Sequence, residues 1–531
     1  MRSTTMPPSI REATFEVMRR HGMTTIFSNP GSTEVSFLVD LPDDIHFVLA
    51  LHEGSVVGIA SGYAIARREP TFVLLHTTAG LGNAVGAIAT ARVNHAPLVI
   101  VVGQQDRRHL ALQPFLAGEL EGLAGTYPLD VISPVRAQDV PSAIGRAAHT
   151  AMTGQGPVLV IVPMDDWEAT VDPGARASAE TLFQPETTPT DLGELPDLIA
   201  ASESPVIVAG SANDSEDGWV TLVGLAERLG APVWQEAFGS RAGFPQDHRL
   251  YRGQLPADRT RVHQALAGHD LLVVVGAAAL RQYTYADDLL VPEGMRVVVI
   301  TADHEEARRS PADLSVLGDP AGIVRALASQ VPRRNVTLPD RVLRNPAGLE
   351  GGAFRAAQVF AQLDRVFGPD AIIVEESPST RPLLEDIIPT RRPLGFLSAA
   401  MGGLGFAMPA AIGLKMALPD RPVIAVVGDG SSLYAIQSLW TAAHQGVSVL
   451  FVVMANGRYA VMDRLADRQQ GKPPWPAFPE VSIGGLARSF GCPAQRIEDA
   501  AALEKSLHEL ELSAGPMLLE VVVPVEENFA P

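Results

Sequence analysis

PVIAVVGDGSSLYAIQSLWTAAHQGVSVLFVVMANGRYA (residues 422–460) contains two short apolar runs separated by a stretch of helical character. The first run ends at Asp429 and the second at Asn456, and we expect Ser431 to open the intervening helix. Apolar runs of this kind predict strands that are covered on both faces of a parallel sheet. The segment therefore predicts a strand–helix–strand unit, and such open α/β sheets bind ligands at the carboxyl ends of their strands.

The polar residues at these two strand ends indicate a metal and phosphate site. Asp429 and Asn456 offer hard oxygen ligands, and two protein oxygens together with phosphate oxygens are the usual environment of Mg²⁺. The helix beyond Ser431 offers free N–H groups and the positive end of its dipole, which suit a phosphate. Alone, each residue is more simply explained as a capping or turn residue, but their pairing at two buried strands favours the joint site.

The remaining sequence repeats the alternation of short apolar runs and amphipathic stretches, which predicts an α/β protein with mainly parallel sheets. Two polar, proline-containing stretches around 171–191 and 331–352 are interpreted as linkers. The sequence thus predicts three parallel-sheet α/β domains at 1–172, 190–332 and 351–531. The predicted strands are 24–28, 46–51, 71–76, 97–103, 157–163, 205–209, 271–276, 296–301, 371–375, 422–427, 447–454 and 517–523, with helices at 9–21 and 54–68.

Composition restricts the classes of function. With 41 Lys and Arg against 60 Asp and Glu, the formal net charge is −19, which disfavours binding to nucleic acid or to an anionic membrane surface. The single cysteine, Cys492, cannot form an intrachain disulfide, and the charged first twenty residues lack an export signal, so we expect a cytoplasmic protein. The uncharged run at 394–414 is long enough to span a bilayer, but its glycines and proline favour a buried loop that enters a helix.

The 422–460 segment resembles the binding motif for thiamine diphosphate (ThDP), and the resemblance extends over essentially the whole chain. The family is that of the ThDP-dependent 2-ketoacid decarboxylases, in particular the benzoylformate decarboxylases. The other matching stretches are FSNPGSTEVSF (27–37), LALHEGSVVGIASGYA (49–64), LHTTAGLGNAVGA (75–87), VVGQQD (101–106) and GGLGFAMPAAIG (402–413). The resemblance implies pyrimidine-binding, middle and diphosphate-binding domains in that order. It also implies ThDP with Mg²⁺ as cofactors, with Ca²⁺ as an alternative ion, and a homotetramer (a dimer of dimers) with active sites shared between chains.

Glu53 follows a predicted strand and precedes an apolar helix, so we expect it to be partly buried at a sheet edge. Taken alone, such a glutamate would most simply stabilise the helix dipole. In the ThDP family, the matching glutamate hydrogen-bonds N1′ of the aminopyrimidine and promotes the imino form that removes the C2 proton. A carboxylate in a dry pocket suits this role, because its proton responds strongly to the ring nitrogen. The resemblance therefore makes Glu53 a catalytic and cofactor-binding residue.

The resemblance assigns further cofactor contacts. The carbonyl of Gly402 would accept a hydrogen bond from the 4′-amino group, and Leu404 would press between the two rings. A helix-entry turn with a core leucine is the alternative explanation of these two residues. The other implied cofactor residues are Ser377, Ser379, Asp429, Gly430, Ser431, Asn456 and Tyr459, and the implied metal ligands are Asp429, Asn456 and the backbone oxygen of Arg458.

On the substrate side, Ser32 matches the family serine that binds the ketoacid carboxylate, although it could equally cap the following helix. His76 matches the active-site histidine that would orient the ketoacid and shuttle a proton, although a lone histidine at a strand end is more often structural. The second histidine of the family corresponds to Tyr283, which donates hydrogen bonds but is a poor proton donor near neutral pH. The remaining predicted pocket residues are Phe115, Leu116, Ser398 and Leu465.

The sequence therefore predicts ThDP- and Mg²⁺-dependent, non-oxidative decarboxylation of a benzoylformate-like 2-ketoacid to an aldehyde and CO₂. The alternative is a carboligase similar to acetolactate synthase that forms 2-hydroxyketones, because Tyr283 weakens the protonation that releases an aldehyde. A catalytically silent cofactor-binding protein would not need Glu53, Asp429 and Asn456 together. The glycines at 80–86 resemble a dinucleotide fingerprint, but their spacing is wrong for a nicotinamide enzyme. The side chain of the ketoacid stays open.

Overall fold

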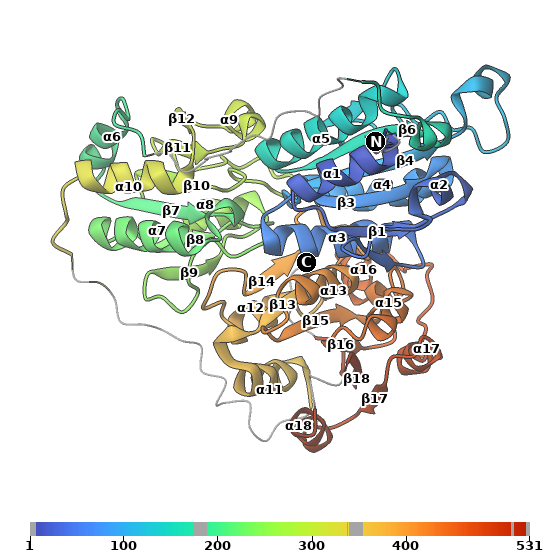
Figure 1. The fold of residues 1–531 in the computed structure, drawn as a ribbon. Coiled ribbons are helices and arrows are strands. Elements are labelled where there is room, and N and C mark those ends of the chain that lie inside the picture. The colour runs from blue at the N-terminus through green and yellow to red at the C-terminus, as the bar shows by residue number, and fades with distance from the viewer. Residues whose placement is uncertain (1–6, 174–187, 337, 339–353, 511–514, 527–531) are drawn as a thin grey trace.

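The chain folds into three lobes, each built around a six-stranded parallel sheet (Figure 1). The computed structural model describes residues 7–173, 188–336, 338, 354–510 and 515–526. In Figure 1 the first lobe is blue to cyan, the middle lobe green to yellow and the third lobe orange to red, and helices flank every sheet. The predicted α/β fold with three parallel-sheet domains is thus confirmed.

The first sheet has the strand order β2-β1-β3-β4-β6-β5. Its four inner strands are almost completely buried, as the apolar runs of the sequence predict. The elements are α1 (Ile10–Arg20), β1 (Thr25–Asn29), η1 (Ser32–Glu34), α2 (Val35–Leu38), β2 (His46–Leu49), α3 (Glu53–Arg67), β3 (Thr71–His76), α4 (Thr77–Val93), β4 (Leu98–Gln104), η2 (Arg107–Leu112), β5 (Asp130–Ile132), η3 (Ala137–Asp139), α5 (Val140–Gly154), β6 (Pro157–Pro163) and η4 (Met164–Glu168).

The middle sheet has the order β12-β11-β10-β7-β8-β9. Its elements are α6 (Leu195–Ala201), β7 (Pro205–Ala209), η5 (Ser211–Asn213), α7 (Glu216–Leu229), β8 (Val233–Gln235), β9 (Tyr251–Gln254), α8 (Arg259–Ala265), β10 (Leu271–Val275), β11 (Arg296–Thr301), α9 (His304–Arg309), β12 (Leu314–Leu317) and α10 (Pro320–Gln330). Its apolar residues form two clusters, one on each face of the sheet, that belong to this lobe alone.

The third sheet has the order β14-β13-β15-β16-β18-β17. Its elements are α11 (Ala356–Phe367), η7 (Gly368–Asp370), β13 (Ile372–Glu376), α12 (Arg381–Ile387), β14 (Phe396–Ser398), α13 (Ala407–Ala417), β15 (Val423–Gly428), α14 (Asp429–Ser432), α15 (Ser438–His444), β16 (Val449–Ala455), α16 (Ala460–Arg468), α17 (Ile483–Ser489), β17 (Ala494–Ile497), α18 (Ala500–His508) and β18 (Met517–Val522).

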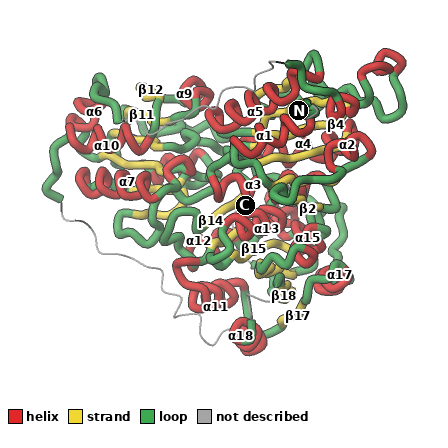
Figure 2. The backbone as a smooth tube through the Cα atoms, viewed as in Figure 1, coloured by secondary structure: helices red, strands yellow, loops and turns green. Residues whose placement is uncertain are grey.

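The first and third lobes share one continuous hydrophobic core, in which α3 crosses α13. Small residues make this close crossing possible. A Cβ atom added to Gly58 would lie 2.7 Å from Pro409, and one added to Gly62 would overlap the backbone of Ala410. Figure 2 shows these two helices side by side between the two sheets. The crossing therefore fixes the first and third sheets relative to each other.

Each sheet has a switch point, which we define as the gap between two neighbouring strands whose following connections run in opposite directions. It lies between β1 and β3 in the first sheet, between β7 and β10 in the middle sheet, and between β13 and β15 in the third. Ligands of open α/β sheets bind at the carboxyl ends of the strands at such points. In the first and third sheets, the predicted site residues at these strand ends are Ser32, His76, Ser377, Ser379, Asp429, Gly430 and Ser431.

Two local predictions need correction. The helix expected to begin at Ser431 is broken, because α14 is a single turn and α15 begins only at Ser438. The strands β5, β8, β9, β12, β14 and β17 were not predicted. The uncharged run at 394–414 forms β14, a loop and α13, as expected, and within the described ranges no helix is long and apolar enough to cross a membrane. Parts of both predicted linkers (174–187 and 339–353) lie outside the described residues.

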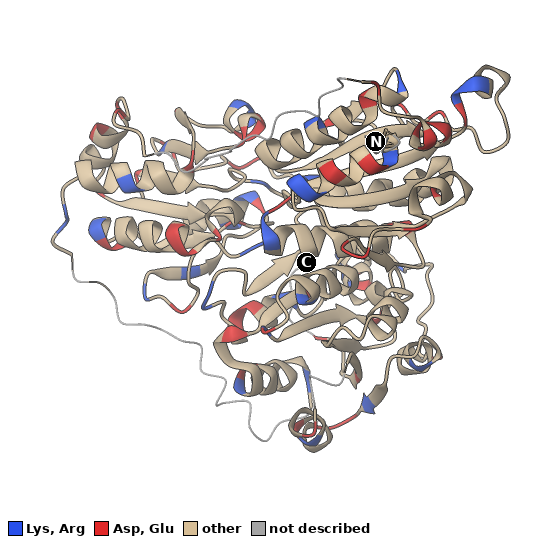
Figure 3. Ribbon diagram, in the orientation of Figure 1, with Lys and Arg blue, Asp and Glu red and all other residues tan. Residues whose placement is uncertain are grey.

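Charged side chains lie mainly on the outer elements. In the view of Figure 3, Lys and Arg alternate with Asp and Glu over the helices and loops, while the strands carry almost no charge. In this view the acidic residues are therefore spread over many elements and are not concentrated at one sheet edge.

Candidate active site

Glu53 is the first residue of α3, and its side chain is buried, with 8% of the residue exposed. Its Oε1 accepts a hydrogen bond from the amide of Asn29 and its Oε2 accepts one from the amide of Asn83, each at 3.1 Å. The helix is capped by another residue, because the His52 ring accepts the N–H of Gly54 at 3.0 Å. Glu53 is therefore not needed as a cap, and two amides fix the orientation of its carboxylate.

His76 ends β3, beside the β1 segment that leads into η1. Its Nδ1 lies 3.0 Å from Oε2 of Glu34 and 3.0 Å from the hydroxyl of Thr33. The buried Glu34 carboxylate also accepts the N–H of Gly31 at 2.7 Å. A Cβ atom on Gly31 would overlap the His76 ring, so only glycine fits there. These contacts hold the ring through Nδ1 and leave Nε2 as the nitrogen that can meet a ligand.

Ser32 lies in η1, directly after Gly31, and is exposed. The N-cap of η1 is Gly31, and no side chain caps this helix. The alternative role of Ser32 as a helix cap is therefore wrong. The fold places Ser32 and His76 at the same switch point, between β1 and β3.

Asp429 and Asn456 meet at the carboxyl ends of β15 and β16. The buried Asp429 carboxylate accepts the N–H groups of Gly430 at 2.8 Å, Asn456 at 2.8 Å and Gly457 at 2.6 Å. Burial raises the pKa of Asp429, and the three N–H donors oppose this shift. The side-chain oxygen of Asn456 accepts the N–H of Arg458 at 3.2 Å. The structure thus brings together the two oxygen-bearing residues of the predicted metal site.

Tyr459 covers this strand end. A Cβ atom on Gly430 would lie 2.6 Å from a ring carbon of Tyr459, so position 430 has room only for glycine. The Tyr459 ring packs against Phe478 with a centroid distance of 5.0 Å. Arg458 turns its guanidinium to Asp463 at 2.7 Å, and its carbonyl oxygen accepts the N–H of Ala460 at 3.1 Å. A carbonyl oxygen has two lone pairs, so this bond leaves one for a metal.

The predicted diphosphate donors lie at the neighbouring strand ends of the third sheet. Ser377 follows β13 and is buried, and its hydroxyl lies 2.6 Å from that of Thr380. Ser379 is partly exposed, and Ser431 is buried in α14. Because β13 and β15 flank the switch point, these hydroxyls and Asp429 share one edge of the sheet.

The loop between β14 and α13 has left-handed glycines, with φ +73° at Gly402 and φ +89° at Gly405. Such backbone angles favour glycine. The loop does lead into α13, but Leu404 is 40% exposed, so the alternative is wrong in making Leu404 a core leucine. Gly402 and Leu404 are therefore exposed, and a ligand or another chain can reach them.

A single chain does not bring the remaining substrate-pocket residues together. Phe115 is 88% exposed on the projecting loop after η2, and Leu116 beside it is also exposed (Figure 1). Tyr283 is 65% exposed in a loop of the middle lobe. Ser398 is buried between the lobes, where its hydroxyl lies 3.5 Å from the carbonyl of Gly239. Leu465 is half-buried on α16.

Sequence reasoning missed five residues of this site. Glu34, Thr33, Asn29 and Asn83 orient the two chemically important side chains of the first lobe, and Phe478 supports Tyr459. The first four lie inside segments that carry the family resemblance, which was the available signal. The glycines at 80, 82 and 86 lie within α4, so they form no dinucleotide-binding loop.

The donor set agrees with ThDP and Mg²⁺. Among the described residues, no three His, Cys, Asp or Glu side chains gather into a metal site. One carboxylate, one amide oxygen and a backbone carbonyl instead match Mg²⁺, which usually takes its other ligands from water and phosphate. The cradle at Gly430 and the hydroxyls of Ser377 and Ser431 supply the polar surface that a diphosphate needs.

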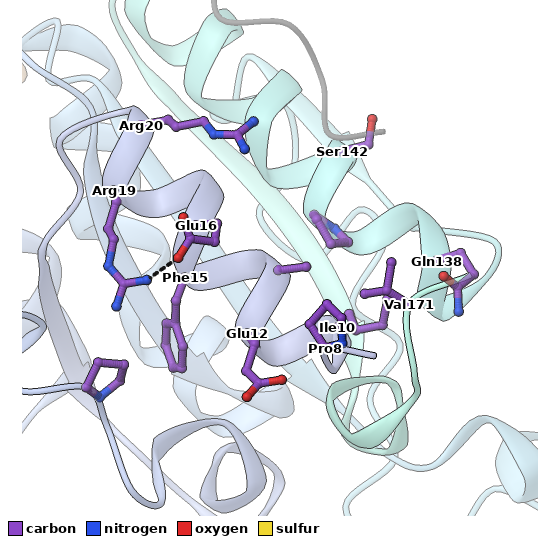
Figure 4. Close-up of a pocket in the computed structure, with 13 residues that line it drawn as sticks. Pro8, Ile10, Glu12, Phe15, Glu16, Arg19, Arg20, Gln138, Ser142 and Val171 are labelled. Carbon is purple, nitrogen blue, oxygen red and sulfur yellow. Dashed lines mark hydrogen bonds and ion pairs between the residues drawn. The ribbon is translucent and has the colours of Figure 1, made fainter. Parts of the chain in front are cut away.

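A separate hollow of about 630 Å³ lies on the outer face of the first lobe, between α1 and α5 (Figure 4). Its lining includes Ile10, Phe15 and Val171, with the Glu16–Arg19 ion pair at its rim. It contains none of the predicted site residues, so it does not compete with the strand-end site.

Three family models match the chain in sequence. The N-terminal TPP binding domain of thiamine pyrophosphate enzymes matches residues 8–124, their central domain matches 192–327, and their C-terminal TPP binding domain matches 382–521. The order is that of the three sheets.

Individual proteins match over nearly the full length. The benzoylformate decarboxylase of Pseudomonas aeruginosa is 38% identical over 97% of this chain and 98% of its own. The acetolactate synthase large subunit of Parasynechococcus marenigrum is 29% identical over 98% of this chain and 88% of its own. The solved structure of the ThDP-dependent 4-hydroxybenzoylformate decarboxylase of Rhodococcus jostii has a TM-score of 0.92 and 33% identity, covering 98% of this chain and 100% of that one. The benzoylformate decarboxylase structure from Polynucleobacter necessarius has a TM-score of 0.92 and 32% identity, covering 98% and 99%.

Proposed function

The chain belongs to the thiamine pyrophosphate enzyme family and is a carboxy-lyase, and from this premise we propose that it decarboxylates a benzoylformate-like 2-ketoacid to an aldehyde and CO₂. The observation that carries the proposal is Glu53, a buried carboxylate whose two oxygens are fixed by Asn29 and Asn83. Activation of ThDP requires such a group, because a carboxylate in a dry setting can hold or release a proton at the pyrimidine nitrogen.

The cofactors that we propose are ThDP and Mg²⁺. Asp429, Asn456 and the Arg458 carbonyl would hold the metal, while Ser377, Ser379 and Ser431 would bind the diphosphate. When bound, ThDP supplies a nucleophilic carbon that adds to the keto group and accepts the electron pair that departing CO₂ leaves behind.

The first lobe would handle the substrate. The hydroxyl of the exposed Ser32 would hold the ketoacid carboxylate, and Nε2 of His76 would hold or move a proton at the reacting carbon. Glu34 and Thr33 keep the ring in one orientation. Orientation of this kind lowers the barrier because the proton donor needs no rearrangement.

We further propose a homotetramer whose active sites are shared between chains. All hydrogen bonds described for the Glu53 carboxylate stay in the first lobe, and those of Asp429 stay in the third. Exposed apolar side chains lie on both lobes, notably Phe115 on the first lobe and Leu404 and Tyr459 on the third. A second copy would cover them and bring the two halves together. The single buried Cys492 supports a cytoplasmic location for the assembly.

Co-expression of two inactive variants tests the shared site. A hybrid of Glu53→Gln and Asp429→Ala chains contains one intact site if Glu53 of one chain works with Asp429 of its partner. We expect activity to return in the purified hybrid at a ThDP concentration that is too low for the Asp429→Ala protein to bind the cofactor. Hybrids as inactive as the parent variants would place both residues in the site of one chain.

Product analysis tests the reaction. The purified protein, loaded with ThDP and Mg²⁺, should convert benzoylformate to benzaldehyde and CO₂. Absence of aldehyde from benzoylformate and from related aromatic and aliphatic 2-ketoacids would reject the decarboxylase.

A carboligase is the second candidate, because Tyr283 is exposed in the middle lobe and offers no imidazole for protonation. The carboligase hypothesis predicts a 2-hydroxyketone as the main product when benzaldehyde is added with the ketoacid. Aldehyde release that is unaffected by added benzaldehyde would reject it.

A further inference from the structure

The loop 399–405, between β14 and α13, is clamped at its start by a residue of the first lobe. Asn94 directly follows α4 and is completely buried. Its amide nitrogen donates to the carbonyl of Ser398 at 2.9 Å, and its amide oxygen accepts the N–H of Ala400 at 2.9 Å. The amide nitrogen and the amide oxygen of this side chain therefore both bind the backbone that enters the loop.

The end of the same loop is clamped from within the third lobe. Glu376 is the last residue of β13 and is buried. Its Oε1 accepts the N–H of Gly405, and its Oε2 accepts those of Phe406 and Ala407, each at 2.7 Å. The carboxylate thus fixes both the last loop residue and the first turn of α13.

Between the two clamps, the tip of the loop faces outward. Gly402 and Leu404 are exposed, and the backbone turns through a hydrogen bond from the N–H of Gly402 to the carbonyl of Ala399 at 2.9 Å. With a left-handed glycine in the exposed tip (Gly402) and another at the end of the loop (Gly405), this backbone has little stiffness of its own. Its position must therefore be set by the groups that hold its ends.

We propose that Asn94 and Glu376 are positioning residues that hold the 399–405 loop so that the Gly402 carbonyl meets the 4′-amino group of ThDP. This inference rests on the proposed function, since it assumes that ThDP occupies the site. Neither side chain needs to touch the cofactor. Each acts through the backbone that it binds, one at either end of the loop.

Glu376→Gln separates positioning from general stability. Glutamine keeps the size of the side chain but replaces one acceptor oxygen with a donor, so one clamped N–H loses its partner. Glu520→Gln is the matched control. Glu520 is a buried glutamate of β18 in the same sheet, and it accepts the N–H of Gly484 at 2.8 Å, far from the loop in the strand order.

The experiment compares two ligands in the presence of Mg²⁺ and without substrate. The ligands are ThDP and the analogue in which hydrogen replaces the 4′-amino group, and their affinities are measured by calorimetric titration. The wild-type protein should prefer ThDP. We expect Glu376→Gln to weaken ThDP binding by about tenfold, the scale of one hydrogen bond, and the analogue by much less. The preference for the amino group should therefore shrink, while Glu520→Gln should keep the wild-type preference.

The possible outcomes separate this inference from the proposed function. A Glu376→Gln protein that binds ThDP less tightly but keeps the full preference would overturn the positioning role. A wild-type protein without any preference would overturn the Gly402 contact and with it this inference, although ThDP binding would stand. A wild-type protein that binds neither ligand would reject the proposed function itself.

A second pair of variants tests the other clamp and covers a failure of Glu376→Gln to fold. Asn94→Asp keeps the acceptor for Ala400 but places a carboxylate oxygen against the Ser398 carbonyl. Asn213→Asp is its control, because Asn213 is equally buried but donates to Val275 in the middle lobe. We expect loss of the amino-group preference in Asn94→Asp only. An unchanged preference in folded Asn94→Asp would remove Asn94 from the proposal.

Discussion

The switch points of the first and middle sheets differ in what meets at the strand ends. Between β1 and β3, the His76 ring packs on Gly31, and polar side chains line the edge. Between β7 and β10, backbone packs on backbone. A Cβ atom on Gly210 would overlap Ala277, and the N–H of Gly210 donates to the carbonyl of Val275 at 3.0 Å. The middle crevice is filled by its own chain, whereas the first offers side chains to a ligand.

Each of these regions also has a buried glutamate, but the donors differ. Glu53 is held by two side-chain amides. Glu236 accepts the N–H of Ser211 at 2.7 Å, the hydroxyl of Ser211 at 2.8 Å and the N–H of Ala278 at 3.1 Å. Glu236 therefore ties down the loops that close the crevice, and its role is structural. Under the proposed function, residue type and burial do not distinguish the catalytic Glu53 from the structural Glu236, whereas their hydrogen-bond partners do.

The largest effect should come from the same substitution at the first of these glutamates. Glu53→Gln removes the exchangeable proton but keeps the shape of the side chain, so ThDP and metal should stay bound. Turnover of benzoylformate should fall by about two to four orders of magnitude, the usual contribution of a general acid–base group. Steady-state kinetics with a parallel ThDP titration measures both quantities. Near wild-type turnover would show that Glu53 is as structural as Glu236.

A smaller effect is expected at the switch point of the third sheet, which resembles the first in offering side chains. Asp429→Ala removes one hard oxygen from the proposed Mg²⁺–diphosphate clamp. Cofactor affinity should fall by about 10- to 100-fold, and excess ThDP with Mg²⁺ should restore part of the activity. Gel filtration in a chelator measures the retained cofactor. Retention equal to that of the wild-type protein would show that Asp429 does not hold the metal.

A third test asks whether the middle lobe contributes to the chemistry through its exposed loop. Tyr283 is 65% exposed, so Tyr283→His should leave the fold and ThDP affinity unchanged. If imidazole supplies the missing proton, the ratio of aldehyde release to carboligation should rise by about tenfold, below the roughly hundredfold minimum of a fully placed general acid. Tyr283→Phe should leave the ratio almost unchanged. Chromatography of products from benzoylformate with benzaldehyde gives the ratio, and no change in Tyr283→His would leave His76 as the sole candidate proton donor.

The sequence was most informative where a residue's neighbours along the chain determine its surroundings. The central strands form continuous apolar runs, so every one of them was predicted to within about two residues. Strands at or next to the sheet edges, such as β12 (Leu314–Leu317) and β17 (Ala494–Ile497), are short and half-exposed, so no apolar run marks them. The helix expected at Ser431 failed for a similar reason, because helical composition does not reveal that the chain turns again before Ser438.

The site was predictable only as far as its motifs reach. Glu53, Asp429 and Asn456 belong to recognisable segments, whereas their supporting residues become visible only after folding. Asn83 meets Glu53 from another helix, and Asn94 meets Ser398 across 304 residues of sequence. Phe115 lies outside the core of the single chain, where neither its sequence neighbours nor its exposed position marks it as a pocket residue.

The smallest predicted effect concerns the structural glutamate of the middle sheet. Glu236→Gln should leave the turnover of folded protein unchanged, because the filled crevice takes no part in the reaction. It should lower the melting temperature, because the glutamine NH₂ group faces an N–H of Ser211 or Ala278. One lost buried hydrogen bond corresponds to about 1–3 kcal/mol, or about 2–4 °C per kcal/mol for a domain of this size. Loss of activity comparable to that of Glu53→Gln would show that Glu236 takes part in the reaction.

The difference in melting temperature between the wild-type protein and Glu236→Gln should also depend on pH. Burial raises the pKa of Glu236 above its ordinary value of 4.5, although hydrogen bonds from Ser211 oppose the shift. The folded protein therefore binds this proton more tightly than the unfolded chain, so the stabilisation is complete below pH 4.5 and is lost as pH rises. Glutamine does not titrate, so the melting temperature of the wild-type protein minus that of Glu236→Gln should be largest in acid and shrink toward neutral pH.

Glu227→Gln in the same lobe should show the opposite trend. Burial opposes its shift in part, but hydrogen bonds from Arg249 and His248 lower the pKa of Glu227, so its contribution is lost as pH falls. Scanning calorimetry of the wild-type protein and both variants from acid to neutral pH measures the two differences in melting temperature. If both differences change with pH in the same direction, Glu236 carries no proton linked to folding.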